Sequence, residues 1–130
     1  MKIQLTVNGE TLDICSVNIG KGREHDFSLF KNSKLRIHES IQIIADKGYQ
    51  GLNQEHMNSL IPVKKTKYHN LNEVEQAYNH AISQDRIKIE HVNGYLKRFK
   101  ILSSKFRNER SHMKKIVRLI CGIYNFQHIR

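Results

Sequence analysis

Two carboxylates in this 130-residue sequence stand where a functional site could form, and Asp46 is the first. It follows the short, β-branched run of residues 41–45 and precedes the turn-forming sequence KGYQG. A carboxylate at the carboxyl end of a buried strand, beside glycines that let the backbone turn, lies where open α/β sheets place their sites. The alternative is a turn residue whose side chain bonds only to its own backbone.

Glu90, the second carboxylate, lies in a helical segment with two chemically different faces. At 100° per residue, one arc of about 80° holds the apolar side chains Ile89, Val92, Leu96 and Phe99. A second arc of similar width surrounds Glu90 with the polar side chains Arg86, Asn93, Lys97 and Lys100. One acid among cations suits a metal ligand held against phosphates. The alternative is a solvated face with an ion pair between residues four apart.

Gly94 lies one turn beyond Glu90, inside the same helical segment. A glycine in a helix interior costs about 1 kcal/mol relative to alanine. We therefore expect another group to approach the helix closely at this position.

The positive charge of the chain lies wholly in its second half. The net charge is +10, yet residues 1–60 carry seven basic and seven acidic side chains, whereas residues 61–130 carry 15 basic and five acidic ones. Residues 97–118 alone hold nine basic side chains and one acid, with Phe99 and Phe106 between them. This pattern fits a surface that follows nucleic-acid phosphates, although helical spacing also explains the phenylalanines as core.

Several classes of protein are excluded by what the sequence lacks. Cys15 and Cys121 lie far apart without a C-x-x-C partner, so they predict small buried residues of a reducing compartment rather than a disulfide framework or a zinc ribbon. The N-terminal sequence MKIQLTVNGE is too polar for a signal peptide, and the most apolar window is half a membrane span. We expect a cytoplasmic protein without a membrane segment.

The order of elements predicts an α/β domain. Alternating residues 3–7 predict a strand, and Asn8-Gly9 predicts a hairpin to a second strand over residues 12–19. A short helix is expected at residues 25–30, a central strand at 41–45 and an edge strand at 60–63 beside Pro62. Helices are expected over residues 71–102 and 111–126.

Six stretches, in this order and spacing, resemble one family: VNGETLDIC, GKGREHDFSLF, IIADKGYQGL, IPVKK, ISQDRIKIEHVNGYLKRFKIL and RNERSHMKKIVRLICGIYNF. The chain resembles the C-terminal part of the catalytic domain of bacterial insertion-sequence transposases of the DDE type. This resemblance implies an RNase H-like, retroviral-integrase-like fold, with a mixed sheet flanked by helices. It also implies one partial domain over residues 1–130.

The resemblance assigns roles to individual residues. Asp46 matches the second catalytic aspartate, and Glu90 matches the catalytic glutamate in an R-x3-E-x6-K pattern. Ser83 stands where some related transposases have a tyrosine three residues before the arginine. The resemblance further implies DNA contacts by Arg86, Asn93, Lys97, Arg98 and Lys100, and support of the site by His25 and Asp26. For His25 the alternative is a capping role at a helix start.

The chemistry implied by the resemblance is metal-dependent hydrolysis and strand transfer of DNA, with magnesium or manganese as cofactor. Three carboxylates commonly hold two such ions, which activate the nucleophile and stabilise the leaving oxygen. The partners would be transposon ends and target DNA, together with an upstream transposase segment or a second copy of the chain.

The family's first catalytic aspartate is expected on a strand before the hairpin, where this chain begins. The earlier aspartates match other positions, Asp13 in the second strand and Asp26 in the family's His-Asp pair. We therefore expect a fragment truncated at the N-terminal strand, inactive alone and marginally stable because a sheet edge is exposed. The alternatives are a non-enzymatic DNA-binding module or transposition inhibitor, and a small basic ribonuclease using histidines.

Overall fold

The computed structural model describes residues 2–99 and 110–128 of the chain. The chain divides into two compact units. The hairpin unit consists of Met1–Glu24 and Lys88–Arg130, and the turn unit consists of His25–Ile87. The boundary falls within the long helix α3, Glu73–Leu96, so this helix contributes residues to both units.

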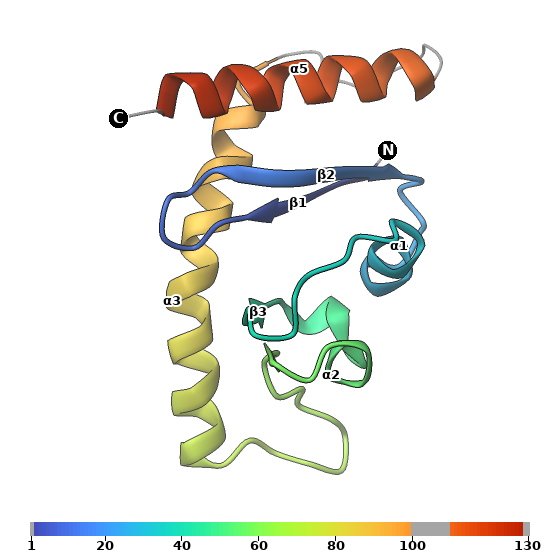
Figure 1. Cartoon of the computed structure of the whole chain (residues 1–130). Helices are drawn as coiled ribbons and strands as arrows, with labels where there is room; N and C mark the ends of the chain where they lie inside the picture. The colour runs from blue at the N-terminus through green and yellow to red at the C-terminus, as the bar shows by residue number, and fades with distance from the viewer. Residues whose placement is uncertain (1, 100–109, 129–130) are drawn as a thin grey trace. The chain divides into compact units, whose positions relative to one another are not determined.

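The hairpin unit begins with an antiparallel pair of strands, β1 (Lys2–Val7) and β2 (Ile14–Gly20), shown in Figure 1. The predicted hairpin is confirmed, but its turn is longer than a two-residue Asn-Gly turn. The Asn8 side chain accepts hydrogen bonds from the backbone N–H groups of Glu10 and Thr11. Leu12, with φ of 64°, takes a left-handed conformation at the end of this turn.

One core joins the hairpin to α5 (Arg110–His128), which lies against β2. Its buried members come from both strands, from the end of α3 and from one face of α5; they are Leu5, Ile14, Val92, Leu96, Met113, Val117, Ile120, Cys121 and Tyr124. The Tyr124 hydroxyl donates to the Leu12 carbonyl at 2.9 Å, and the Asn125 amide both accepts from and donates to the Ile14 backbone. These bonds satisfy backbone groups of the hairpin that would otherwise lack partners.

The turn unit contains short elements: α1 (Asp26–Asn32), β3 (Ile43–Ile44), the 3-10 helix η1 (Lys47–Tyr49), α2 (Leu52–Glu55) and β4 (Ser59–Leu60). β3 and β4 form a parallel pair. Both strands are shorter than predicted, and β4 ends before Pro62 because a proline cannot donate to a ladder. The Asn79 amide of α3 both accepts from and donates to the Val63 backbone.

The start of α3 is a capping box. The Asn72 side chain accepts from the Glu75 N–H at 2.8 Å, and the Glu75 carboxylate accepts from the Asn72 N–H at 3.2 Å. The long helix predicted from about residue 71 therefore begins at Glu73 and runs past Ser83 without a break. Predicted residues 100–102 of that helix lie outside the described part of the chain.

The α/β prediction is confirmed, because helices accompany one antiparallel and one parallel strand pair. In the described residues these strands form two separate two-stranded sheets rather than one mixed sheet. Cys121 is buried as predicted, whereas the prediction for Cys15 is wrong, because this thiol is exposed on β2. Asp13 precedes β2 instead of lying within it. None of the described helices is long and apolar enough to cross a membrane.

Candidate active site

Asp46 lies at the end of β3 and caps η1 with its side chain. Its Oδ1 accepts the Gly48 backbone N–H at 2.9 Å. The turn role considered for this residue is therefore present. In the part of the chain that the structure describes, Oδ2 of this half-buried carboxylate has no hydrogen-bond partner. One oxygen thus fixes the side chain, and the other is available to a ligand.

Helix α1 packs against the turn that carries Asp46. A methyl group at Gly48 would lie 2.7 Å from Oδ2 of Asp26 and 3.3 Å from Oδ1 of Asp46, so both carboxylates surround one point. His25 is the N-cap residue of α1, as its alternative reading at a helix start predicts, but its exposed side chain makes no capping hydrogen bond. The structure brings Asp26 beside Asp46, while a role for His25 stays a prediction.

The donor chemistry of this turn fits a hard divalent cation. Asp26 and Asp46 offer only carboxylate oxygens, the ligands that Mg²⁺ takes together with waters and substrate phosphates. Among the described residues no group of three or more His, Cys, Asp or Glu side chains converges to form a metal site. The ligands in the turn unit therefore fit an ion that one or two protein carboxylates hold and that needs further ligands from elsewhere.

The two faces predicted for the Glu90 segment differ in burial as expected. Val92 and Leu96 are buried, and Ile89 and Phe99 pack against the same core. On the polar face Glu90 and Lys97 are exposed, whereas Arg86 and Asn93 are half-buried. Lys97 lies one residue beyond α3, where its N–H still bonds to the Asn93 carbonyl. Lys100 and Phe106 lie outside the described residues.

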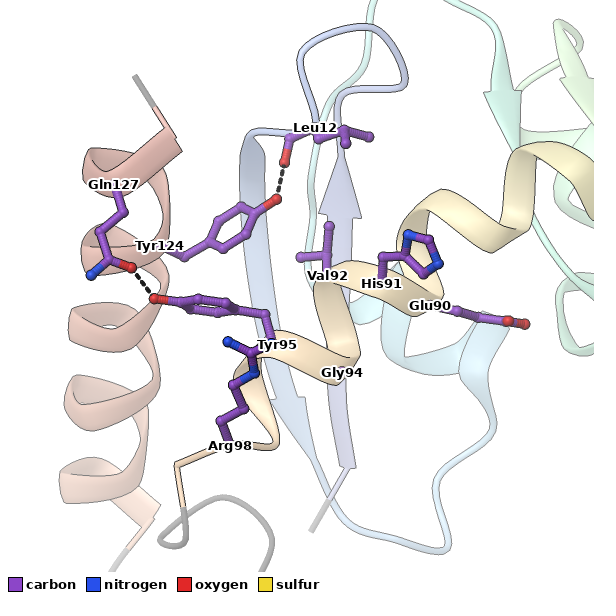
Figure 2. Close-up of a pocket in the computed structure, with 9 residues that line it drawn as sticks. All are labelled: Leu12, Glu90, His91, Val92, Gly94, Tyr95, Arg98, Tyr124 and Gln127. Atoms are coloured by element: carbon purple, nitrogen blue, oxygen red, sulfur yellow. Dashed lines mark hydrogen bonds between the residues drawn. The ribbon is translucent and has the colours of Figure 1, made fainter. Parts of the chain in front are cut away.

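Arg98 does not lie on the polar face that carries Glu90. Its guanidinium stands 5.6 Å from the centre of the Tyr95 ring, and both line an open cavity of about 630 Å³ together with Glu90, Gly94 and Tyr124. Figure 2 shows Tyr95 and Tyr124 pointing toward each other, with Glu90 directed away from α5. The Tyr95 hydroxyl donates to Gln127. Arg98 is thus paired with an aromatic ring beside α5.

Two further positions of α3 clarify predictions made from the sequence. At Gly94 a methyl group would meet nothing within 4 Å, so no described part of the chain makes the close approach expected there. The Ser83 hydroxyl, at the position where some transposases have a tyrosine, donates to the His80 carbonyl at 2.6 Å. Gly94 therefore leaves open space beside Glu90, and Ser83 bonds within its own helix.

Asp46 belongs to the turn unit and Glu90 to the hairpin unit. A metal site shared by these two carboxylates stays a prediction. Sequence reasoning missed the contact between Asp26 and Gly48, which are 22 positions apart. It also missed the pairing of Tyr95 with Arg98, although their i, i+3 spacing on a helix was a readable signal.

Comparisons with known proteins identify the family of the chain. Residues 1–125 match the family described as DDE superfamily endonuclease. The chain is 42% identical over 127 residues to the probable transposase for insertion sequence element IS702 of Microchaete diplosiphon. This alignment covers 98% of the chain but only 46% of that relative. No solved structure matches the chain. The family match extends over nearly the whole sequence, and the chain therefore belongs to the DDE superfamily of endonucleases and is similar to insertion-sequence transposases.

Proposed function

We propose that this chain forms the C-terminal part of an RNase H-like catalytic domain that cleaves and joins DNA during transposition in the cytoplasm. The observation that carries the proposal is the Asp46 carboxylate, which has one oxygen fixed by the Gly48 N–H and the other without a described partner. This geometry suits a ligand that is held rigidly while keeping one oxygen for a cation. The family match over residues 1–125 supports the same assignment.

Asp46 and Glu90 are the proposed protein ligands of Mg²⁺ or Mn²⁺, the kind of ion that endonucleases of this superfamily use. When bound, such ions neutralise charge on the scissile phosphate and favour displacement at phosphorus. Arg86 and Asn93, on the same helix as Glu90, and Lys97, one residue beyond it, are proposed to hold the DNA backbone with cationic and amide groups. Asp26 would support the Asp46 turn, and residues 1–130 would act as one domain in the complete fold.

The relative from Microchaete is more than twice as long as the segment that this chain matches. Two-metal sites of this kind commonly use three carboxylates, and only two are proposed here. We therefore propose that cleavage requires a further carboxylate from a segment like the unmatched part of that relative. The same segment is proposed to pair with an open edge of the hairpin sheet formed by β1 and β2.

A strand-cleavage assay tests this function directly. The chain would be assayed alone and fused to the unmatched part of the Microchaete relative, with DNA carrying the ends of that element and with Mg²⁺, Mn²⁺ or a chelator. We expect little cleavage by the chain alone and metal-dependent cleavage by the fusion. Asp46→Asn and Glu90→Gln should each lower the rate by more than the roughly 100-fold loss caused by outer-shell changes. Glu55→Gln, at an exposed site, is the matched control and should retain activity.

A second candidate function is DNA binding without chemistry. It is favoured by α5, which exposes Lys114, Lys115 and Arg118 and contains no acidic residue. In that case salt-dependent DNA binding would persist in the isolated chain, and Asp46→Asn and Glu90→Gln would change neither binding nor cleavage in the fusion. Robust metal-dependent cleavage by the isolated chain would contradict the requirement for a further segment.

A further inference from the structure

Three residues of helix α1 each lie against one residue of the turn that carries Asp46. The Asp26 carboxylate lies against Gly48, and a methyl group at Gly51 would lie 3.9 Å from the Phe27 ring. One turn further along α1, the Phe30 ring packs edge-on against Tyr49, with ring centres 6.4 Å apart. These pairs fix the rotation of α1 relative to the turn, because residues 26, 27 and 30 lie on adjoining parts of one helical face.

Gly48 is the most constrained of these positions. Its N–H donates to Asp46, while the space where its Cβ would stand is taken by Oδ2 of Asp26 at 2.7 Å. Real Cβ atoms do not come this close to an oxygen, so the approach of Asp26 depends on the missing side chain. The glycine therefore admits the Asp26 carboxylate to the same turn that orients Asp46.

We infer that Asp26 is a positioning residue for Asp46, acting through its contact with Gly48. This inference rests on the proposed function, in which Asp46 is a metal ligand. Asp26 fills the space beside the Gly48 α-carbon, and this packing keeps the Gly48 N–H directed at Oδ1 of Asp46. Oδ2 of Asp46 then stays at a fixed place for a cation. Outer-shell groups that orient a ligand in this way commonly change metal affinity by 10–100-fold when they are removed.

A direct test measures Mn²⁺ binding to the full chain by the broadening of NMR signals, and amide hydrogen exchange at Gly48 without metal. Asp26→Ala removes the packing, and we expect about tenfold weaker Mn²⁺ binding together with faster Gly48 exchange. Asp26→Asn keeps the shape without the charge, so it should stay close to the parent in both measurements. Glu55→Ala, which removes an exposed carboxylate elsewhere in the turn unit, is the control.

Gly48→Ala provides an independent variant because it displaces the Asp26 carboxylate without deleting it. The clashing atom is the end of a flexible side chain, so we expect the fold to persist while Mn²⁺ binding weakens as in Asp26→Ala. In the double variant that combines Asp26→Ala with Gly48→Ala, the new methyl group occupies the space that the Asp26 carboxylate has left. The second substitution should therefore add little to the first, which is the signature of one shared interaction.

The possible outcomes separate this inference from the proposed function. If Asp26→Asn weakens Mn²⁺ binding as much as Asp46→Asn does, Asp26 is a ligand and the inference is wrong. Parent-like Mn²⁺ binding and Gly48 exchange in Asp26→Ala would also overturn it. Unchanged Mn²⁺ binding in Asp46→Asn contradicts the proposed metal role, whereas Gly48 exchange in the Asp26 variants still reports whether Asp26 positions the turn.

Discussion

The two predicted catalytic carboxylates are held in opposite ways. Asp46 stands in a crowded turn, where one oxygen bonds to the Gly48 N–H and the Asp26 side chain packs on the same glycine. Glu90 stands on the exposed face of α3, beside open space at Gly94. The position of Asp46 therefore depends on short-range contacts with α1, whereas that of Glu90 depends on how firmly the opposite face of α3 is packed.

This difference has a physical consequence for each site. The geometry of the Asp46 turn is sensitive to small changes in shape, because an atom added at Gly48 must displace a neighbouring carboxylate. A helix face is rigid along its length, since each residue is held by backbone hydrogen bonds, and its exposed side chains tolerate substitution. Substitutions in the Asp46 turn should therefore change mainly the geometry of that turn. The position of Glu90 should change mainly when a core residue behind α3 is substituted.

The largest expected effect on stability is at Leu96, a buried residue of the core-facing side of the helix that carries Glu90. Its side chain is 3% exposed, and Leu96→Ala should destabilise the chain by about 2–5 kcal/mol through lost burial and a cavity. Urea unfolding measures the loss, and hydrogen exchange should quicken more in β1 and β2 than at the Gly48 amide. Leu119→Ala is the control, since this side chain is 64% exposed and its truncation should cost at most about 0.5 kcal/mol. Equal losses of unfolding free energy in Leu96→Ala and Leu119→Ala would contradict the role of Leu96 in holding the helix that carries Glu90.

The Glu90 helix was predictable from the sequence because its signal is periodic and local. Ile89, Val92 and Leu96 recur at helical spacing, and all three pack in the core. Arg98 is among the DNA contacts that the resemblance implies, and that role stays a prediction. At 100° per residue it falls about 120° from the centre of the polar stripe, which agrees with its place beside Tyr95. A run of positive charge in the sequence does not by itself show on which side of the helix each side chain lies.

The Asp46 turn was predictable only in part. Glycines after a β-branched run indicated a turn with a carboxylate at its start, and the structure has both. The lengths of β3 and β4 were overestimated, because strand length depends on the pairing partner and not on propensity alone. The approach of Asp26 to Gly48 was not predictable, because no local pattern links two positions 22 residues apart. The longer turn of the hairpin was not predicted either: the Asn8 side chain accepts the Glu10 N–H, and Leu12 takes the left-handed conformation.

Glycine substitutions sharpen the contrast between the two sites at a smaller scale. Gly94→Ala should stabilise the chain by up to about 1 kcal/mol, because alanine favours the helix and its methyl group meets nothing within 4 Å. Gly48→Ala meets two carboxylates and should have no such benefit. Thermal unfolding of the two variants measures the difference. If Gly94→Ala also weakens DNA binding, the DNA needs the open space beside Glu90. A lower unfolding temperature for Gly94→Ala than for the parent would contradict the finding that an added methyl group has room there.

The smallest effect concerns the far end of the helix that carries Glu90. Hydrogen bonds from His69 and from the Asn72 N–H lower the pKa of Glu75 below the ordinary value of 4.5. A lowered pKa in the folded chain contributes stability that is fully present above about pH 4.5 and is lost as the pH falls through the lowered value. Glu75→Gln keeps the capping geometry but removes the charge. It should unfold at a slightly lower temperature than the parent at pH 6 and at nearly the same temperature at pH 3.

Glu73→Gln is the matched control for this effect, because both acids lie in the first turn of α3 and face the same helix dipole. Its difference from the parent should be smaller at pH 6, since no ion pair with His69 is lost. Identical pH dependence in the two variants would show that the dipole alone accounts for the effect. A larger loss in Glu75→Gln would show that the capping box holds the start of the helix, although the Glu90 face at its other end depends on Leu96 and the core.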